Sequence, residues 1–113
     1  MHVYVSLRTG RDNSPKLSLE EYVRDDIKLF RKKHSKLVLT KIKPIPTKDK
    51  LDSLCYVFDK LGKEETKECV TYLETKAHIF VITLSCRSPE IYKKAFPAYE
   101  KLVSSFFFMN KTP

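Results

Sequence analysis

The fold is decided by one short stretch of the chain, Ile79-Phe80-Val81-Ile82-Thr83-Leu84. It is the centre of residues 78–86, a segment rich in the β-branched and aromatic residues that favour strands. Successive side chains of a strand point to opposite faces of its sheet, so both faces of this strand would be apolar. A strand of this kind needs cover on both sides. The stretch therefore predicts a sheet that lies between two other layers.

Two segments can supply those layers as helices. The first begins at Ser18-Leu19-Glu20-Glu21, a capping box in which Ser18 and Glu21 each satisfy a free backbone amide. Apolar residues then recur at spacings of three and four, which gives the helix one apolar stripe. The residues of this stripe are Leu19, Tyr22, Val23, Ile27 and Phe30.

The second helical segment begins at Ser88, an N-cap residue followed by Pro89 at the first helical position. Proline disrupts an interior helical turn, so we predict that this helix ends at Ala95 or Phe96 and that a new one begins with Pro97. Residues 107–109 are expected to seal the edge of the domain, with a small exposed apolar patch as the alternative.

The remaining segments read as strands, at residues 2–7, 37–43, 51–61 and 66–75. Pro44 and Pro46 follow the second of these, and because proline cannot donate to a ladder, that segment should lie at an edge or leave the sheet. A Gly62-Lys63 turn suggests that the next two strands form a hairpin. These elements predict an α+β fold, a three-layer α/β/α sandwich with a central, mainly antiparallel sheet, in a single domain over residues 1–113.

Charge is concentrated in one quarter of the chain. The whole sequence carries a formal charge of +8, and residues 24–50 hold ten lysines and arginines against three aspartates. Such a concentration favours an acidic protein or an anionic envelope surface as partner. A solvated helix face followed by a basic edge strand is an alternative that stays open. The candidate partner-binding residues, called the basic stripe below, are Arg31, Lys32, Lys33, Lys36, Lys41 and Lys43.

Nucleic acid is the second candidate partner, because the same charge suits phosphate contacts. The aromatic pattern of the RNA-recognition motif is absent, however, and residues 31–36 contain no interleaved aromatic side chain. We therefore treat a nucleic-acid-binding module as the less favoured interpretation.

Motifs for catalysis, metals and cofactors are missing. With Gly10 and Gly62 as the only glycines, the chain has no phosphate-binding loop of either common type. Its cysteines, Cys55, Cys69 and Cys86, are too widely spaced for a zinc knuckle. We expect them to be reduced and buried, with one disulfide plus a free thiol as the alternative. The sequence thus predicts no enzyme and no cofactor; a cysteine-dependent enzyme acting through Cys86 is a third, weaker hypothesis.

Two stretches, taken in order, resemble a known family. The first is Val3-Tyr4-Val5-Ser6, followed after a loop by Ser18-Leu19-Glu20-Glu21-Tyr22-Val23. The second runs Phe80-Val81-Ile82-Thr83-Leu84-Ser85-Cys86, then Pro89-Glu90-Ile91-Tyr92, Phe96-Pro97-Ala98-Tyr99 and Ser105-Phe106. Their order and spacing are similar to those of the PsbP-like superfamily. It includes extrinsic subunits of the photosystem II oxygen-evolving complex, a Ran-binding nuclear import factor, and bacterial exported or lipoprotein domains.

The resemblance implies an antiparallel sheet sandwiched by helices and a role as a non-enzymatic adaptor or assembly factor. It supplies no motif of functional residues. Family members usually begin with an additional hairpin, often with a proline–tryptophan pair, whereas this chain has no tryptophan and starts after that point. We therefore expect that a leader or N-terminal strands precede Met1 in the natural protein, which favours an extracytoplasmic location. A turn that often bears glycine in the family reads Lys48-Asp49-Lys50 here.

Overall fold

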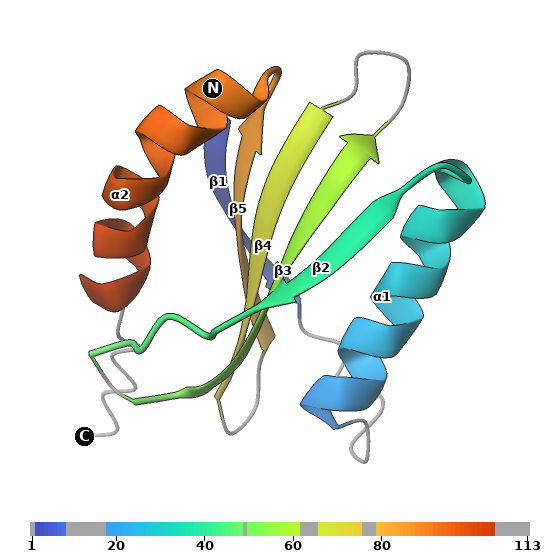
Figure 1. The fold of residues 1–113 in the computed structure, drawn as a ribbon. Helices are drawn as coiled ribbons and strands as arrows, with labels where there is room; N and C mark the ends of the chain where they lie inside the picture. The colour runs from blue at the N-terminus through green and yellow to red at the C-terminus, as the bar shows by residue number, and fades with distance from the viewer. Residues whose placement is uncertain (1, 9–17, 49, 62–65, 76–78, 106–113) are drawn as a thin grey trace.

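The computed structural model describes residues 2–8, 18–48, 50–61, 66–75 and 79–105, with only the backbone described for 2–8 and 61. Within these residues, seven elements follow one another (Figure 1). They are β1 (His2–Arg8), α1 (Leu19–Lys33), β2 (Val38–Ile42), β3 (Asp52–Leu61), β4 (Thr66–Glu74), β5 (Ile79–Cys86) and α2 (Pro89–Ser105).

The strands form one five-stranded sheet in the order β1-β5-β4-β3-β2, and all neighbouring pairs are antiparallel. Strands β2 to β5 form a meander, whereas α1 carries the chain from β1 at one edge to β2 at the other. The predicted hairpin is confirmed as the β3–β4 pair, although its Gly62-Lys63 turn lies outside the described residues. The segment before Pro44 is confirmed as an edge strand, β2.

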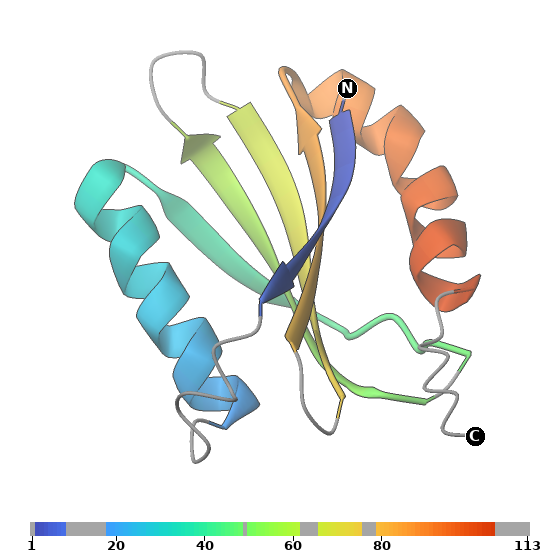
Figure 2. The same ribbon diagram turned by 180° about the vertical axis from the view of Figure 1, so that it is seen from behind.

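The two helices cover opposite faces of the sheet, as Figures 1 and 2 show. On β5, Ile79 and Val81 pack in the core beneath α1, whereas Ile82 and Leu84 pack in the core beneath α2. All four side chains are buried. The predicted α+β, three-layer architecture is therefore correct, and β5 is its central two-sided strand.

Helix α1 begins as its sequence dictates. The Glu21 amide donates to Ser18 Oγ over 3.1 Å, and the Ser18 amide donates to Glu21 Oε1 over 3.4 Å. The helix packs on the sheet through its buried residues Leu19 and Val23. The Asp26 carboxylate also accepts a 2.6 Å hydrogen bond from the hydroxyl of Tyr72 on β4.

Helix α2 corrects one expectation, because it runs without a break from Pro89 to Ser105 with Pro97 inside it. Proline lacks the amide that would bond to the carbonyl of residue 93, but Lys93 and Pro97 are both exposed, so water can satisfy that carbonyl. The buried side chains Ala95, Tyr99 and Val103 continue one packing face across the proline. Tertiary packing thus outweighs the local disruption. Residues 107–109, expected to seal the domain edge, lie outside the described residues.

Between β2 and β3 the chain crosses to the α2 side of the sheet and is anchored there. Ile45 joins the core beneath α2, and the buried hydroxyl of Thr47 accepts a 3.0 Å hydrogen bond from the Leu51 amide. Lys50 has φ of 54°, a left-handed conformation that glycine adopts more readily. A lysine thus occupies a backbone position suited to glycine.

Candidate functional site

The basic stripe does not form one continuous surface. Arg31 and Lys41 line a hollow of about 370 Å³ on the α1 side of the sheet. Lys43 lines a separate hollow on the α2 side. The other three members, Lys32, Lys33 and Lys36, are exposed at the end of α1 and in the turn after it, and line neither hollow. The structure thus brings two of the six predicted residues together.

The hollow on the α1 side, called the basic hollow below, is lined by four cationic side chains. Arg24, Lys28 and Arg31 follow one another along α1 at spacings of four and three, which places them on one side of the helix. Lys41 faces them from β2. None of the four is paired with an acidic side chain of the described part of the chain.

Apolar side chains contribute the rest of that lining, with Glu20 as the one acidic residue among those that line it. Val23 and Ile27 come from α1, and Leu54 and Tyr56 come from β3. Lys41 is the register partner of Tyr56, so the two lie side by side on neighbouring strands. Sequence reasoning counted Arg24 and Lys28 in the charge excess but did not select them. Their helical spacing relative to Arg31 is the signal that could have found them.

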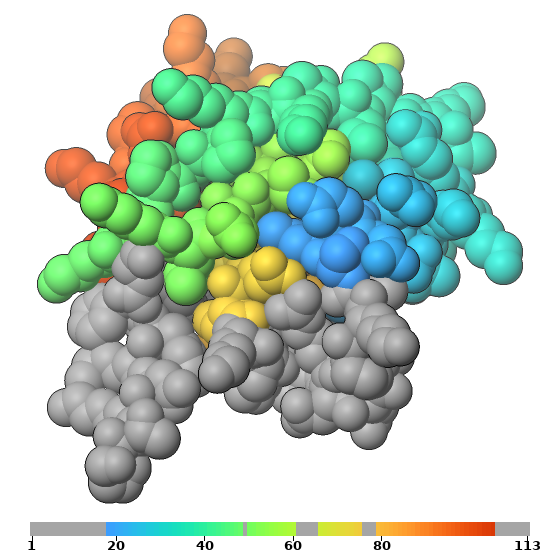
Figure 3. All heavy atoms as spheres, turned by 90° about the horizontal axis from the view of Figure 1, so that it is seen from below, coloured from blue at the N-terminus to red at the C-terminus, as the bar shows by residue number. Residues whose placement is uncertain are grey.

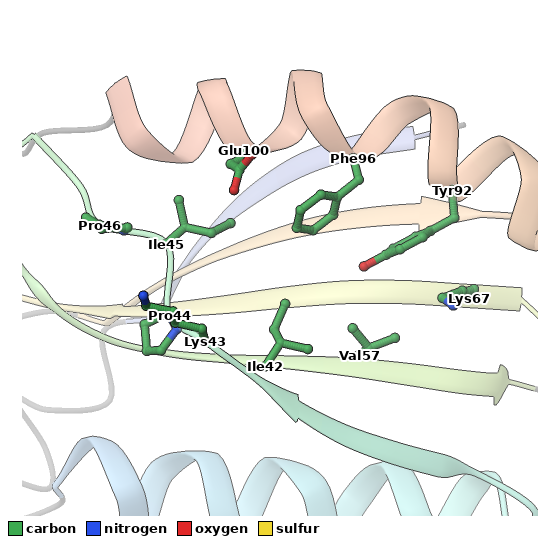
Figure 4. Close-up of a pocket in the computed structure, with 10 residues that line it drawn as sticks. All are labelled: Ile42, Lys43, Pro44, Ile45, Pro46, Val57, Lys67, Tyr92, Phe96 and Glu100. Atoms are coloured by element: carbon green, nitrogen blue, oxygen red, sulfur yellow. The ribbon is translucent and has the colours of Figure 1, made fainter.

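The hollow on the α2 side, called the apolar groove below, is larger, at about 630 Å³. Figure 4 shows Tyr92 and Phe96 pointing from α2 toward the sheet, and Ile42 and Val57 pointing toward the helix. Pro44, Ile45 and Pro46 form one end of the groove. Its size lies within the usual range for ligand pockets, and the sequence reading did not anticipate it.

The groove exists because α2 covers only part of its face of the sheet. The helix packs on β5 and β4. On the same face, the segment that follows β2 lies near α2, on the opposite side of the sheet from α1 (Figure 3), and only this segment approaches β3 and β2 there among the described residues. Small and branched side chains at Val57 and Ile42 do not fill the space that remains.

Among the described residues, three charged ones line the apolar groove. Lys67 has its Nζ 4.7 Å from the centre of the Tyr92 ring and 3.7 Å from Asp59 Oδ1. Lys43 and Glu100 are exposed toward the opposite end, where Figure 4 shows them near Ile45. Each end of the groove therefore carries a lysine, with an apolar middle between them.

A buried polar network lies below Tyr92. Cys55 Sγ is 2.9 Å from Thr71 Oγ1, and Tyr99 Oη is 2.8 Å from the same hydroxyl oxygen. Cys69 belongs to this network through hydrogen bonds to Cys55 and Tyr92. Strand register explains the contact, since Cys55 pairs with Thr71 and Cys69 pairs with Val57, which makes the two cysteines diagonal neighbours. All three cysteines are buried free thiols, as predicted.

These contacts shift the proton affinities of the groups involved. The hydrogen bond from Cys69 lowers the pKa of Cys55 to about 7, although burial opposes it, and the same contact raises the pKa of Cys69. Burial raises the pKa of both Tyr92 and Tyr99. Burial also raises the pKa of Cys86, which faces the α2 core, whereas His34 caps α1 on the other face of the sheet. A nucleophilic pair of Cys86 with His34 therefore does not form.

No group of three or more histidine, cysteine, aspartate or glutamate side chains that could hold a metal ion occurs among the described residues. Neither of the two described helices is long and apolar enough to cross a membrane.

Comparisons with known proteins identify a protein with a similar fold but give no function. No protein-family model matches the chain, and no curated protein matches it. Among solved structures it is similar to PA94 of Pseudomonas aeruginosa, a protein of unknown function, with a TM-score of 0.80 and 12% sequence identity. The match covers 96% of this chain and 73% of that one. At this identity the likeness establishes a shared fold alone.

Proposed function

We propose that this protein is a non-enzymatic binding domain of PsbP-like type, an adaptor or assembly factor that binds an acidic protein surface through the basic hollow. The observation that carries the proposal is the set of four cationic side chains, Arg24, Lys28, Arg31 and Lys41, around one concave site. No described acidic side chain forms an ion pair with them, and Glu20 is the one carboxylate among the described residues that line the hollow, so net positive charge is available to a partner.

The concave shape of the basic hollow, as well as its charge, favours the binding of carboxylates. A partner carboxylate that enters it loses water and meets two guanidinium groups, which bind carboxylates with two parallel hydrogen bonds. The half-buried ring of Tyr56 and the side chain of Leu54 supply apolar contact beside the charges. Such a site binds acidic groups more tightly than an open lysine-rich surface, where single ion pairs contribute less than about 1 kcal/mol.

The PsbP-like assignment is supported by the architecture, since the family resemblance implied an antiparallel sheet between helices and the chain has that arrangement. Many sequences can share an architecture, so the assignment is part of the proposal.

Binding to poly-L-glutamate at low salt tests the function. The double variant Arg31→Glu/Lys41→Glu should lower the affinity at least about tenfold and flatten its salt dependence, because two attractive contacts become repulsive. The matched control is Lys93→Glu/Lys94→Glu, which makes the same charge change at exposed positions of α2 and should change affinity less than about threefold.

Two results would overturn the proposal. The first is equal loss of affinity in both double variants, which would mean that only net charge matters. The second is that a random single-stranded oligonucleotide binds more tightly than poly-L-glutamate and shows the same dependence on Arg31 and Lys41. That result would favour the nucleic-acid-binding module.

A further inference from the structure

The apolar groove is an open, largely apolar concavity that nothing in the described chain fills. Ile42, Val57 and Phe96 form its middle, and the partly exposed ring of Tyr92 closes one end. Apolar surface that is concave and accessible is typical of binding sites for an apolar group of a partner.

The charged residues of the apolar groove indicate which kind of partner it can bind. Lys67 stands at one end, and Lys43 stands at the other with Glu100 across from it. Lys67 is paired with Asp59, whereas the exposed Lys43 forms no ion pair with a described residue, in a chain whose formal charge is +8. An apolar group with acidic residues on its Lys43 side is complementary to this arrangement, whereas one flanked by basic residues is not.

The groove is also joined to the basic hollow through the end of β2. Lys41 lines the basic hollow and Lys43 lines the groove, with Ile42 between them. Continued strand geometry would point Lys43 to the same face as Lys41, but β2 ends at Ile42 and the chain then turns toward α2. Positively charged side chains therefore lie on both sides of the β2 edge of the sheet.

We infer that the partner is an acidic chain segment with one large apolar side chain, which inserts into the apolar groove while a neighbouring carboxylate of the partner binds Lys43. This inference rests on the proposed function and specifies the class of its partner. The basic hollow holds further carboxylates of the same partner across the β2 edge. Affinity then comes mainly from the buried apolar side chain, and preference for acidic flanks comes from the lysines.

The test uses fluorescein-labelled twelve-residue peptides and fluorescence anisotropy. One peptide is built of Asp, Glu and Ser with a central Phe, a second has Ala in place of Phe, and a third has Lys in place of the acidic residues around Phe. We expect the acidic Phe peptide to bind about 10- to 100-fold more tightly than the Ala peptide, the gain typical of burying a large apolar side chain. The basic Phe peptide should bind more weakly than either.

Two further measurements show whether the peptide binds in the apolar groove. Methyl signals of Ile42, Ile45 and Val57 should shift in the NMR spectrum of the unmodified protein when the acidic Phe peptide is added, and should not shift with the Ala peptide. Lys43→Glu should weaken binding of the acidic Phe peptide by about 5- to 10-fold, whereas Lys93→Glu, the same charge reversal at an exposed position of α2, should not.

The possible results distinguish a failure of the groove as binding site from a failure of the proposed function. Equal affinity of the Phe and Ala peptides, with both weakened by Arg31→Glu/Lys41→Glu, would leave the function standing and overturn the groove as anchor site. Tight binding of the basic Phe peptide would overturn the acidic partner class. If no acidic peptide binds, the proposed function fails together with the inference.

Discussion

The phenol oxygen of Tyr99 lies 2.6 Å from the carbonyl oxygen of Ile82, so the middle of α2 is hydrogen-bonded to the backbone of the central strand β5. The carbonyl can only accept, which makes the phenol the donor. Both residues are almost completely buried, and the same phenol oxygen is close to Thr71 on β4. This contact fixes where α2 lies on the sheet, and therefore how much of β3 and β2 is left for the apolar groove.

Tyr99→Phe should lower the free energy of unfolding by about 1–3 kcal/mol, because it leaves a buried carbonyl and the Thr71 hydroxyl with one partner fewer. Urea denaturation followed by circular dichroism measures the change. Tyr56→Phe is the control, since the half-buried Tyr56 lies in the basic hollow, and should change stability by less than about 0.5 kcal/mol. Equal effects of the two substitutions would mean that the Tyr99 contact does not hold α2 in place.

Pro97→Ala should stabilise the protein by about 1–3 kcal/mol, because it restores the backbone hydrogen bond that proline removes from the interior of α2. Thermal unfolding measures the gain. Pro89→Ala changes the first helical residue, where no such bond is missing, and should give no comparable gain. A loss of stability in Pro97→Ala would show that the proline is needed for the course of α2.

Stability should fall as pH rises above about 10. Burial raises the pKa of Tyr92 and Tyr99 in the folded protein, so the unfolded chain loses these protons first. Each group then lowers the free energy of unfolding by about 1.4 kcal/mol per pH unit, and the contribution is fully present below pH 10. Urea midpoints measured from pH 8 to 11 test this, and Tyr99→Phe should show a shallower decline than the unchanged protein.

Cys55 should titrate near neutral pH, since the hydrogen bond from Cys69 lowers its pKa to about 7. A depressed pKa adds stability above the unfolded value of 9.0 and loses that contribution as pH falls through 7. Thiolate absorbance near 240 nm follows the titration directly. Cys69→Ala should move the midpoint upward because it removes the largest of the hydrogen bonds that oppose burial. An unchanged midpoint would mean that Cys69 does not stabilise the thiolate.

Much of the fold could be predicted from the sequence because the signals for individual helices and strands agree with the signals for how they pack. The apolar stretch around Ile82 required two covering layers, and the capping box at Ser18 and the proline at Pro89 placed the starts of both helices. The break expected at Pro97 was wrong, since a local rule took no account of the packing of Tyr99 and Val103 on the sheet.

The candidate sites were less predictable. Charge counting found Arg31 and Lys41, but their proximity depends on how α1 lies beside β2, a tertiary relationship that composition does not contain. The apolar groove depends on where α2 fails to cover the sheet and on the path of the chain after Ile42. The contact between Cys55 and Cys69 needed the register of β3 with β4.

The proposed function requires that the basic hollow binds acidic groups. An amide NMR titration of the isotope-labelled protein with the acidic Phe peptide tests this requirement. We predict that the largest shifts in the spectrum include those of residues 24–31 of α1 and of Lys41 in β2, and that they disappear in Arg31→Glu/Lys41→Glu. Saturable binding whose shifts leave these residues unchanged would contradict the proposed function.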